Sequence, residues 1–509
     1  MSFANLPLEV HCHIISYLLC NRDVAALSIQ CRALHSTCDM AARKKYHQID
    51  ISGGEDGIDQ AFNFLMEILK QPQLALYVRH LKYRTPTSRS SGYKDAAPMR
   101  ELSSDEMGLI KKAVKIGGFE GPQQDQIVNM LMQRMDNALR SYGGYLERER
   151  TQMFITQALA AIIIAVSPNI VSMVTTNPRS YYSGIELPLD QILLRANKSP
   201  GSTPYLCNLR SVYMISETSS TWEDGRFYIT MDLQGFIRLF DRLPSIESVS
   251  TDVMEESDLP ADTLEKSSSD ISKLSICHSS VSSAYLARVI WSCKTLKELR
   301  YSIGGRSTND GGHPIVNAKA LIKAMCYYKR TLETIEIDAE NDIHDLDRDD
   351  PEEVERAFDD YGSPFENGIG EHNRAFMEEI WENSGSLKDF ESLKRLSLGV
   401  KFLAYFAKGV SAPSGEMRKR AIVADCLPNT LEYLCVRGYE KGANEEDDEQ
   451  MDALMTFYKS GQSSLKELLG IEETVPHASY VDDPDGNGHL LWPFDEDSGT
   501  EDEETSDEE

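Results

Sequence analysis

The sequence predicts an α/β protein with a small helical unit at the N-terminus, an irregular solenoid of helix–strand units behind it, and a disordered acidic C-terminal tail. Three observations predict this arrangement. Apolar residues follow helical spacing in residues 1–50, a short apolar motif recurs behind helical segments in residues 51–480, and acidic side chains dominate residues 481–509. We therefore divide the chain of 509 residues into these three parts.

The first fifty residues predict three short helices. Pro7 suits the first turn of a helix, where its missing N–H has no partner to lose, and Asn5 is close enough to help cap that turn. Asp23 is placed to cap a second helix, and a third covers Thr37–Tyr46. The apolar residues of the first helix form one stripe at helical spacing: Val10, Ile14, Ile15, Leu18 and Leu19. Three helices this short bury little apolar surface alone, so a partner or the following domain must cover part of it.

Behind this unit the motif Leu-x-x-Leu-x-apolar recurs and predicts strands. Its last two apolar positions are two residues apart, so they point to one face of a strand and into a core, while the residues between them point outward. The clear copies are Leu296-Leu299-Tyr301, Leu332-Ile335-Ile337, Leu393-Leu396-Leu398 and Leu431-Leu434-Val436. Looser copies are Val78-Leu81-Tyr83, Leu206-Leu209-Val212, Ile271-Leu274-Ile276 and Leu465-Leu468. Helical segments such as 284–292, 318–328 and 451–458 precede some copies, and one helix plus one short strand per unit indicates a leucine-rich-repeat-like solenoid.

The spacing of these copies is irregular. The central positions Leu274, Leu299, Ile335, Leu396 and Leu434 are separated by 25, 36, 61 and 38 residues, whereas regular repeats recur every ~20–29. The widest gap contains an acidic insert at residues 338–373. A degenerate solenoid is the favoured interpretation, and a generic α/β domain rich in leucine is the alternative.

Two stretches have little to bury. Residues 85–98 are rich in Ser, Thr and Pro and predict a mobile loop within the repeat domain. Residues 481–509 end in a run of Asp and Glu that cannot pack a core, so we expect this tail to be disordered.

Charge and composition narrow the possible partners and compartments. The formal net charge is −29, which argues against a nucleic-acid partner. Ten scattered cysteines without framework spacing indicate reduced thiols. The longest apolar run, Ala158–Val166, is too short to cross a bilayer and predicts a buried helix. We expect a protein of the cytoplasm, the nucleus or both, without a membrane partner.

The N-terminal residues resemble the F-box family. The resemblance is carried by Leu6-Pro7-Leu8-Glu9-Val10, by Ile14-Ile15-Ser16-Tyr17-Leu18, by Asp23-Val24-Ala25-Ala26-Leu27, and by Cys31-Arg32. It covers about residues 5–50, and the leucine ladder behind it is similar to that of fungal F-box proteins with degenerate leucine-rich repeats. Leu34 and His35 follow Cys31-Arg32 where the family often has an aromatic residue. The alternative is a three-helix cap at the end of a solenoid.

The resemblance implies a non-catalytic subunit: the substrate receptor of an SCF-type cullin–RING ubiquitin ligase. The partners implied are the SCF adaptor protein and, through it, the cullin and the RING subunit. In the family, the Leu-Pro segment and the apolar faces of the first helices contact the adaptor. Carried over to this chain, the adaptor-binding residues are Leu6, Pro7, Glu9, Ile14, Ile15, Leu18, Leu27 and Cys31.

Outward positions of the strand motif are the candidate surface for an unidentified protein target. Their mixed charges indicate a polar target and do not identify it. The candidates are Lys297, Glu298, Arg300, Glu333, Glu336, Lys394, Arg395, Glu432 and Arg437.

No motif in the chain predicts bond chemistry, a metal or a cofactor. Phosphate-binding loops, His-Glu-x-x-His, Gly-x-Ser-x-Gly and Cys-x-x-Cys are missing from the sequence. His11, Cys12, His13, Cys20, Cys31 and Cys38 lack the close ligand pairs of zinc sites, so buried thiols are expected instead. The segment 483–488 opens like a calcium-binding loop, but its twelfth position is Phe494 where a Glu is needed.

Two other functions compete with the receptor hypothesis. The first is a non-catalytic leucine-rich-repeat scaffold that acts outside a cullin complex. The second is an enzyme of unrecognised type that uses residues of the insert, which would require a deep polar pocket with strongly perturbed titratable groups.

Overall fold

The computed structural model describes most of the chain except the N-terminus, several inter-element segments and the C-terminus. The described residues are 6–18, 21–53, 55–84, 99–134, 145–178, 187–215, 227–256, 264–306, 316–339, 379–380, 382–409, 422–461 and 463–477. The expected mobile loop at 85–98, the expected disordered tail at 481–509 and nearly all of the expected insert at 338–373 lie outside them.

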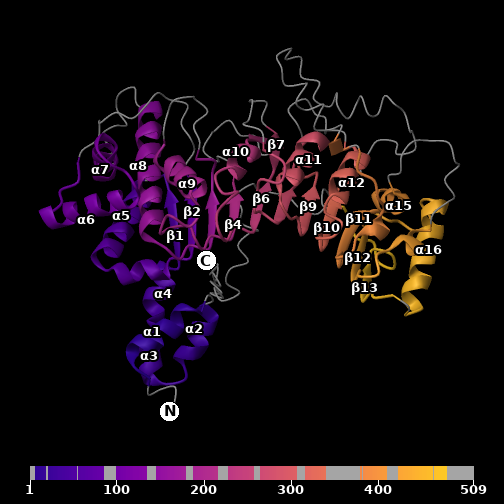
Figure 1. The fold of residues 1–509 in the computed structure, drawn as a ribbon, viewed down its shortest axis with the longest axis horizontal. Helices are drawn as coiled ribbons and strands as arrows, with labels where there is room; N and C mark the ends of the chain where they lie inside the picture. The colour runs from indigo at the N-terminus through magenta and orange to yellow at the C-terminus, as the bar shows by residue number, and fades with distance from the viewer. Residues whose placement is uncertain are drawn as a thin grey trace, which may run out of the picture.

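The fold is α/β, and its centre is a parallel sheet whose strands are stacked in chain order, as in a solenoid (Figure 1). The sheet contains eleven strands, and each pairs with the units immediately before and after it. The strands are β1 (Gln48–Ser52), β2 (His80–Arg84), β3 (Ser172–Thr175), β4 (Ser211–Met214), β6 (Ser248–Asp252), β8 (Lys273–Cys277), β9 (Glu298–Ser302), β10 (Thr334–Asp338), β11 (Arg395–Gly399), β12 (Tyr433–Arg437) and β13 (Glu467–Leu469). Two short strands, β5 (Ile229–Met231) and β7 (Met254–Glu256), form a separate parallel pair.

Three apolar positions per unit hold each strand against the core. The first lies just before the strand, and the other two alternate within it, so all three side chains leave the outer face of the sheet free. In β9 they are Leu296, Leu299 and Tyr301, which are almost completely buried. Each such burial stabilises the fold by about 1.5–3 kcal/mol.

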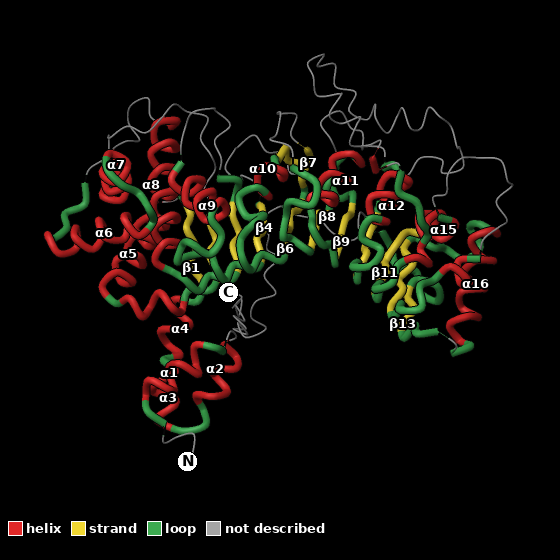
Figure 2. Tube along the Cα trace, viewed as in Figure 1, coloured by secondary structure: helices red, strands yellow, loops and turns green. Residues whose placement is uncertain are grey.

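Helices cover one face of the sheet and leave the other open, so that the molecule is an arch with the strands along its inner side (Figures 1 and 2). They are α5 (Glu55–Lys70), α6 (Ser104–Ile116), α7 (Pro122–Met132), α8 (Tyr145–Val166), α9 (Pro188–Lys198), α10 (Leu233–Ile237), α11 (Ser283–Ser292), α12 (Ala318–Cys326), α15 (Val400–Lys408) and α16 (Glu445–Lys459), with 3-10 turns η2 (Pro72–Tyr77), η5 (Leu387–Asp389) and η6 (Val423–Cys426). Side-chain caps set several starts: Ser282 accepts from the Tyr285 N–H at α11, and Asn317 from the Ala320 N–H at α12. We call the open face of the sheet the concave face.

The N-terminal unit contains four helices, not the predicted three. They are α1 (Leu8–Ser16), α2 (Asn21–Ser28), α3 (Arg32–Cys38) and α4 (Met40–Tyr46). Asp39 divides the predicted third helix, because its backbone is left-handed at φ 44° and its side chain caps α4 by accepting from the Ala42 N–H. The unit has its own small core of Ile15, Val24 and Cys38, separate from the core of the solenoid.

The strand motif is confirmed for seven of its eight copies. In the eighth, Leu206-Leu209-Val212, each buried position is taken by the next apolar residue along the chain. Leu206 lies in a turn with φ 60°, and the pattern in β4 is Leu209-Val212-Met214 instead. Three strands have no predicted copy because Ile, Met, Val, Tyr or Thr takes the place of leucine. These are β1 with Tyr46-Ile49-Ile51, β3 with Ile170-Met173-Thr175 and β6 with Ile246-Val249-Thr251, and every one of these side chains is buried.

An inserted helical layer accounts for the longest interval between strands. Between β2 and β3 the chain forms α6, α7 and α8, and α8 packs against α5, α6, α7 and α9. The run Ala158–Val166, predicted as a buried helix, is the C-terminal part of α8, and Ile162, Ile163 and Ile164 are fully buried there.

Removing a buried leucine should destabilise the solenoid far more than removing a charged neighbour. Leu299→Ala leaves a cavity in the core and is expected to lower the free energy of unfolding by about 2–5 kcal/mol. Lys297→Ala on the adjacent surface should change it by about 0.5 kcal/mol or less. Urea unfolding of both variants checks this, and similar losses in the two would contradict the assignment of Leu299 to the core.

Acid should destabilise the protein in part through His80 on β2. This imidazole is buried, its Nδ1 lies 2.7 Å from Ser172 Oγ, and burial, together with the charges of His47 and Arg79, lowers its pKa from 6.5 to about 3. The unfolded chain therefore binds a proton below pH 6.5 that the folded chain refuses until about pH 3. Over this window the free energy of unfolding falls with decreasing pH, by up to about 1.4 kcal/mol per pH unit from this group.

The test is the slope of unfolding free energy against pH for His80→Gln, compared with the parent and with His35→Gln at an exposed position. His80→Gln should flatten the slope between about pH 6 and pH 4, and His35→Gln should not. Equal slopes in all three proteins would show that His80 takes up a proton in the folded state.

Candidate protein-binding surfaces

The first helix presents apolar side chains on two neighbouring faces, about 100° apart, because each member of one set is next in sequence to a member of the other. His11 and Ile15 are buried, and Leu18 packs beside Ile15 against the core of the N-terminal unit. A second set of apolar residues has the same helical spacing. Val10 is 39% exposed, Ile14 is half-buried and Tyr17 is 70% exposed. We call Val10, Ile14 and Tyr17 the outer stripe of α1. The predicted single stripe is thus two stripes, and only one is needed to hold the unit together.

The predicted adaptor-binding residues divide between surface and interior. Pro7 and Glu9 are exposed, Leu6, Ile14 and Cys31 are half-buried, and Leu18 and Leu27 pack partly buried on the small core. Ile15 is only 2% exposed and belongs to that core, so it stabilises the unit and offers no contact surface. Pro7 caps the start of α1, and its carbonyl accepts the N–H groups of Val10 and His11 at 3.0 and 3.1 Å.

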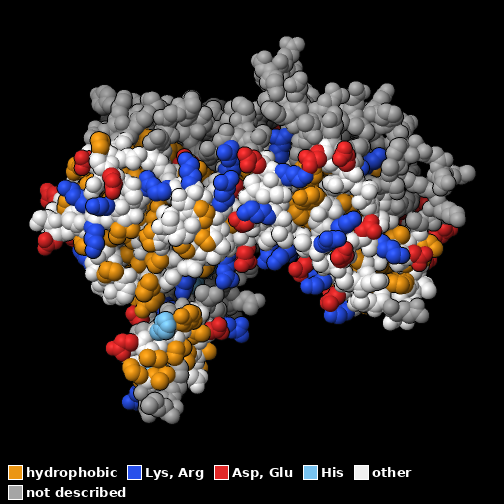
Figure 3. Space-filling view, in the orientation of Figure 1, with side chains coloured by type: hydrophobic (Ala, Val, Ile, Leu, Met, Phe, Trp, Pro, Cys, Tyr) orange, Lys and Arg blue, Asp and Glu red, His pale blue; other side chains and the backbone are white. Residues whose placement is uncertain are grey.

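Three exposed apolar residues of this unit were not predicted: Val10 and Tyr17 as contact residues, and Ile29 at the end of α2, which is 78% exposed. The spacing of three and four residues from Val10 through Ile14 to Tyr17 is the signal that identifies the outer stripe. Space-filling views show apolar side chains gathered on the projecting unit (Figure 3). Large apolar side chains left in solvent at this density mark an interaction surface.

The nine predicted target-binding residues all come to β9–β12 or to the residue just before these strands. A line of alternating charge precedes β9 to β13, and we call Lys297, Glu333, Lys394, Glu432 and Lys466 the charge ladder. The backbone sets its register, because the Lys297 carbonyl accepts the N–H groups of Glu333 and Thr334 at 2.8 and 3.0 Å, and the same pattern repeats at each later strand.

Ion pairs join the rungs of the charge ladder. Lys394 Nζ lies 2.9 Å from Glu333 Oε2, and Lys466 Nζ lies 2.7 Å from Glu432 Oε2. The hydrogen bond from Lys394 lowers the pKa of Glu333 and itself raises the pKa of Lys394, and the bond from Lys466 lowers the pKa of Glu432. Exposed pairs of this kind contribute little to stability, so their charges are free to exchange partners with a bound protein.

The remaining predicted residues point out of the concave face beside the ladder. Arg300 Nε lies 2.7 Å from Glu298 Oε1 and 3.5 Å from Glu336 Oε2. The Arg395 guanidinium lies 4.0 Å from the centre of the Tyr433 ring, a cation–π contact. The face over β9–β12 is therefore polar and balanced in sign.

Arg437 is directed elsewhere than predicted, because it holds the end of the described chain. Its Nη1 donates to the carbonyl of Pro476 at 3.0 Å and lies 3.9 Å from Asp338 Oδ2, while its Nε donates to Ser397 Oγ at 3.2 Å. It is half-buried in this position. Its first role is to anchor the segment that follows β13.

The middle of the concave face is rich in serine, and Lys273 on β8 lies 3.7 Å from Glu247 Oε2 there. Ser248, Ser250 and Ser275 point outward from β6 and β8 and are half-buried. Beside them is a group we call the outer apolar cluster: Val174 on β3, Tyr213 on β4, and Ile215 just after β4. This cluster is separate from the main core and was not predicted.

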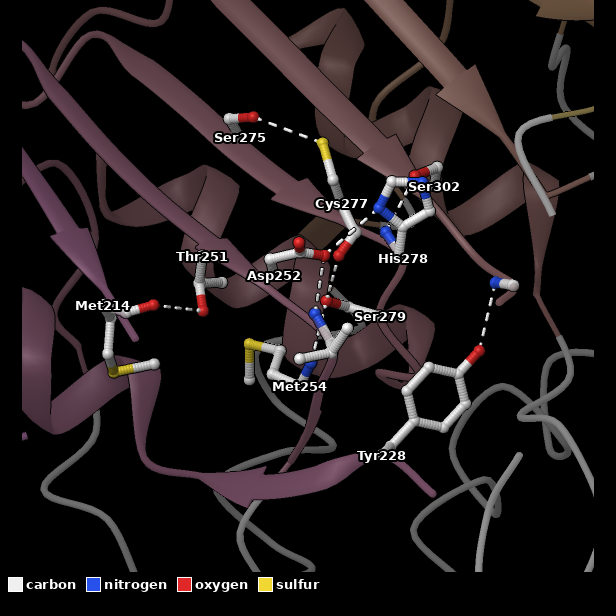
Figure 4. A network of polar contacts seen from close by, with 12 residues as sticks. Met214, Tyr228, Thr251, Asp252, Met254, Ser275, Cys277, His278, Ser279 and Ser302 are labelled. Atoms are coloured by element: carbon white, nitrogen blue, oxygen red, sulfur yellow. Dashed lines mark hydrogen bonds and ion pairs between the residues drawn. The ribbon is translucent and has the colours of Figure 1, made fainter. Parts of the chain in front are cut away.

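A polar network fastens the ends of β6, β8 and β9 (Figure 4). His278 Nδ1 lies 3.2 Å from Asp252 Oδ1, and the His278 N–H donates to Ser302 Oγ at 2.9 Å. Ser279 Oγ donates to the Cys277 carbonyl at 2.6 Å and accepts the Met254 N–H at 3.1 Å. These bonds hold the chain where it leaves the strands, at left-handed backbone positions that include His278 with φ 44°.

The network contains an Asp–His pair, but its Ser279 and Ser302 hydroxyls bond main-chain groups and its Cys277 thiol lies 3.4 Å from Ser275 Oγ. In a catalytic triad the ring nitrogen opposite the carboxylate activates a nucleophile. Here Ser279 and Ser302 bond main-chain groups, and burial raises the pKa of the Cys277 thiol, which disfavours the reactive thiolate. Among the described residues, no group of three or more His, Cys, Asp or Glu side chains is placed to hold a metal ion.

Of the helices in the described parts of the chain, none combines the length and apolarity needed to cross a membrane. No protein-family model matches the sequence, and no curated protein is significantly similar to it.

Proposed function

We propose that this chain is the substrate receptor of an SCF-type cullin–RING ubiquitin ligase. In this proposal the N-terminal unit binds the SCF adaptor protein, the concave face holds a protein target, and the chain performs no bond chemistry. It acts by raising the concentration of target lysines near the ubiquitin carrier of the ligase.

The observation that carries the proposal is the outer stripe of α1. The small core uses Ile15 and Leu18 of α1, while Val10 and Tyr17 of the adjoining outer stripe stay exposed outside it. The F-box-like sequence of residues 5–50 supplies the kind of partner that the second face would bind. The polar outer residues Glu9 and His13 flank the stripe, as the rim of a protein interface requires.

The placement of the unit is compatible with a receptor. The helices α1–α3 project from the β1 end of the arch, while α4 packs on η2 and β1 and joins the unit to the solenoid (Figure 1). An adaptor on α1 would therefore leave the concave face open. That face offers charges of both signs at the charge ladder, which suits recognition by electrostatic complementarity.

The test is co-purification of the SCF adaptor and the cullin with the full-length chain. In the variant Val10→Asp/Tyr17→Asp, two carboxylates replace apolar contacts at the outer stripe, and recovery of both partners should fall by about tenfold or more. The matched control is Ile116→Asp on α6, whose parent side chain is exposed to nearly the same extent as Val10. It should bind the partners as the parent does.

Ile15→Ala separates a lost contact from a lost fold. Because Ile15 lies in the small core, it should weaken adaptor binding only together with loss of helical signal or thermal stability. Recovery of neither partner by folded parent protein would reject the receptor function and favour a scaffold that acts outside a cullin complex.

A further inference from the structure

We propose that the apolar segment Leu490–Phe494 of this chain docks in cis on the outer apolar cluster, so that the C-terminal tail occupies the concave face of its own solenoid. The sequence of this segment is Leu-Leu-Trp-Pro-Phe. The inference does not depend on the ubiquitin-ligase proposal, because it concerns two parts of one chain.

The last described residues lie beside the ends of β12 and β10. After β13, Val475 pairs in parallel with Arg437, and the Gly438 N–H donates to the Val475 carbonyl at 2.9 Å. His477 then reaches β10, and its Nδ1 lies 2.8 Å from Asp338 Oδ1. The chain thus runs from the last strand toward the middle of the sheet, past the end of β12 to the end of β10.

This return path is built into the fold. A Cβ at Gly438 would overlap the ring of His477, and a Cβ at Gly470 would overlap the carbonyl oxygen of Val436. Both glycines have positive φ values, 66° and 86°. His477 and Asp338 are each less than a tenth exposed, so the described part of the chain ends at an anchored point beside β10.

The outer apolar cluster is deeply buried for a group on the open face of the sheet. Val174, Tyr213 and Ile215 are 2%, 5% and 3% exposed although they lie on the open face of the sheet. The neighbouring outward residues Lys82 on β2 and Ser250 on β6 are only half-buried. Among the described outward residues of this region, deep burial is thus found at β3 and β4 and at His80 on β2.

Residues 478–494 are long enough to reach the outer apolar cluster and end in apolar side chains. From β10 to β4 is four strand spacings, or about 19 Å. Leu490 follows His477 by thirteen positions, and thirteen extended residues span up to about 45 Å. Residues 490–494 are the longest apolar run after His477, and every other part of residues 478–509 is dominated by polar or acidic side chains.

Charge favours the same placement. Residues 495–509 are mostly Asp and Glu and include no Lys or Arg. With Trp492 and Phe494 on β3 and β4, this acidic run would lie near Lys82 and Arg84, which point outward from β2. Arg84 is also paired with Asp50 Oδ2 at 2.6 Å, so the acidic run would share this cation with Asp50.

The experiment is binding of a fluorescent peptide of residues 486–509, followed by fluorescence anisotropy. The receptor is the full-length chain carrying Trp492→Ala/Phe494→Ala, whose own tail no longer competes. We expect it to bind the peptide, and we expect the parent chain to bind at least about tenfold more weakly because its tethered tail has an effective concentration in the millimolar range.

Further variants locate the site. On the background of Trp492→Ala/Phe494→Ala, Tyr213→Ala should lower the affinity for the 486–509 peptide by about tenfold or more. Val174→Thr keeps the shape of the side chain, so the protein should stay folded and still bind this peptide more weakly. Leu469→Ala on β13 is the matched outward apolar control and should bind as the background does. A peptide of residues 495–509 alone should bind much more weakly than 486–509.

Three results would overturn the proposal. The first is no binding of the peptide to the tail variant. The second is equal binding by the Tyr213→Ala, Val174→Thr and Leu469→Ala proteins, which would assign the cover of the cluster to residues 179–186 or 216–226. The third is equal binding of the 495–509 peptide, which would reduce the contact to charge attraction. None of these results depends on whether an adaptor binds α1.

Discussion

The parallel pairing of successive strands is the constraint on which the rest of this structure depends. Each strand takes its hydrogen-bond partners from the units before and after it, so every unit must return the chain to the same height and register. The three apolar positions per unit enforce that return, because a shift of one residue would turn Leu299 and its equivalents into solvent. The helices can vary in length and number, as α6–α8 show, provided that they deliver the chain to the next strand. Surfaces for binding then arise in rows, since outward residues of adjacent strands are always neighbours.

The sequence predicted the part of the fold that rests on this constraint and missed features that depend on tertiary context. Leu296-Leu299-Tyr301 and its clear relatives were recognisable because leucine occupies the buried positions. The units at β1, β3 and β6 were missed because Ile170, Val249 or Thr251 fills the same space without the leucine signature. Leu206 was misplaced because a left-handed turn cannot be read from apolar spacing.

The candidate surfaces show the same division. The charged residues beside β9–β12 were predictable, because alternation along a strand decides which side chains point outward. The hydrogen bond from Arg437 to the Pro476 carbonyl was not, because Pro476 follows Arg437 by 39 residues and lies outside every copy of the motif. On α1, sequence spacing identified apolar residues but could not say which of two faces the neighbouring helices would cover; Ile15 lies in the core and Val10 is exposed.

The position of the inserted helices gives this architecture a particular freedom to evolve. The helices α6, α7 and α8 lie between the end of β2 and the start of β3, and the two strands still pair in register. Length added between two strands therefore leaves their pairing intact. A lineage can lengthen, shorten or recompose the segments between strands and so acquire a new specificity. The paired strands stay as they are, and changes accumulate in the segments between them.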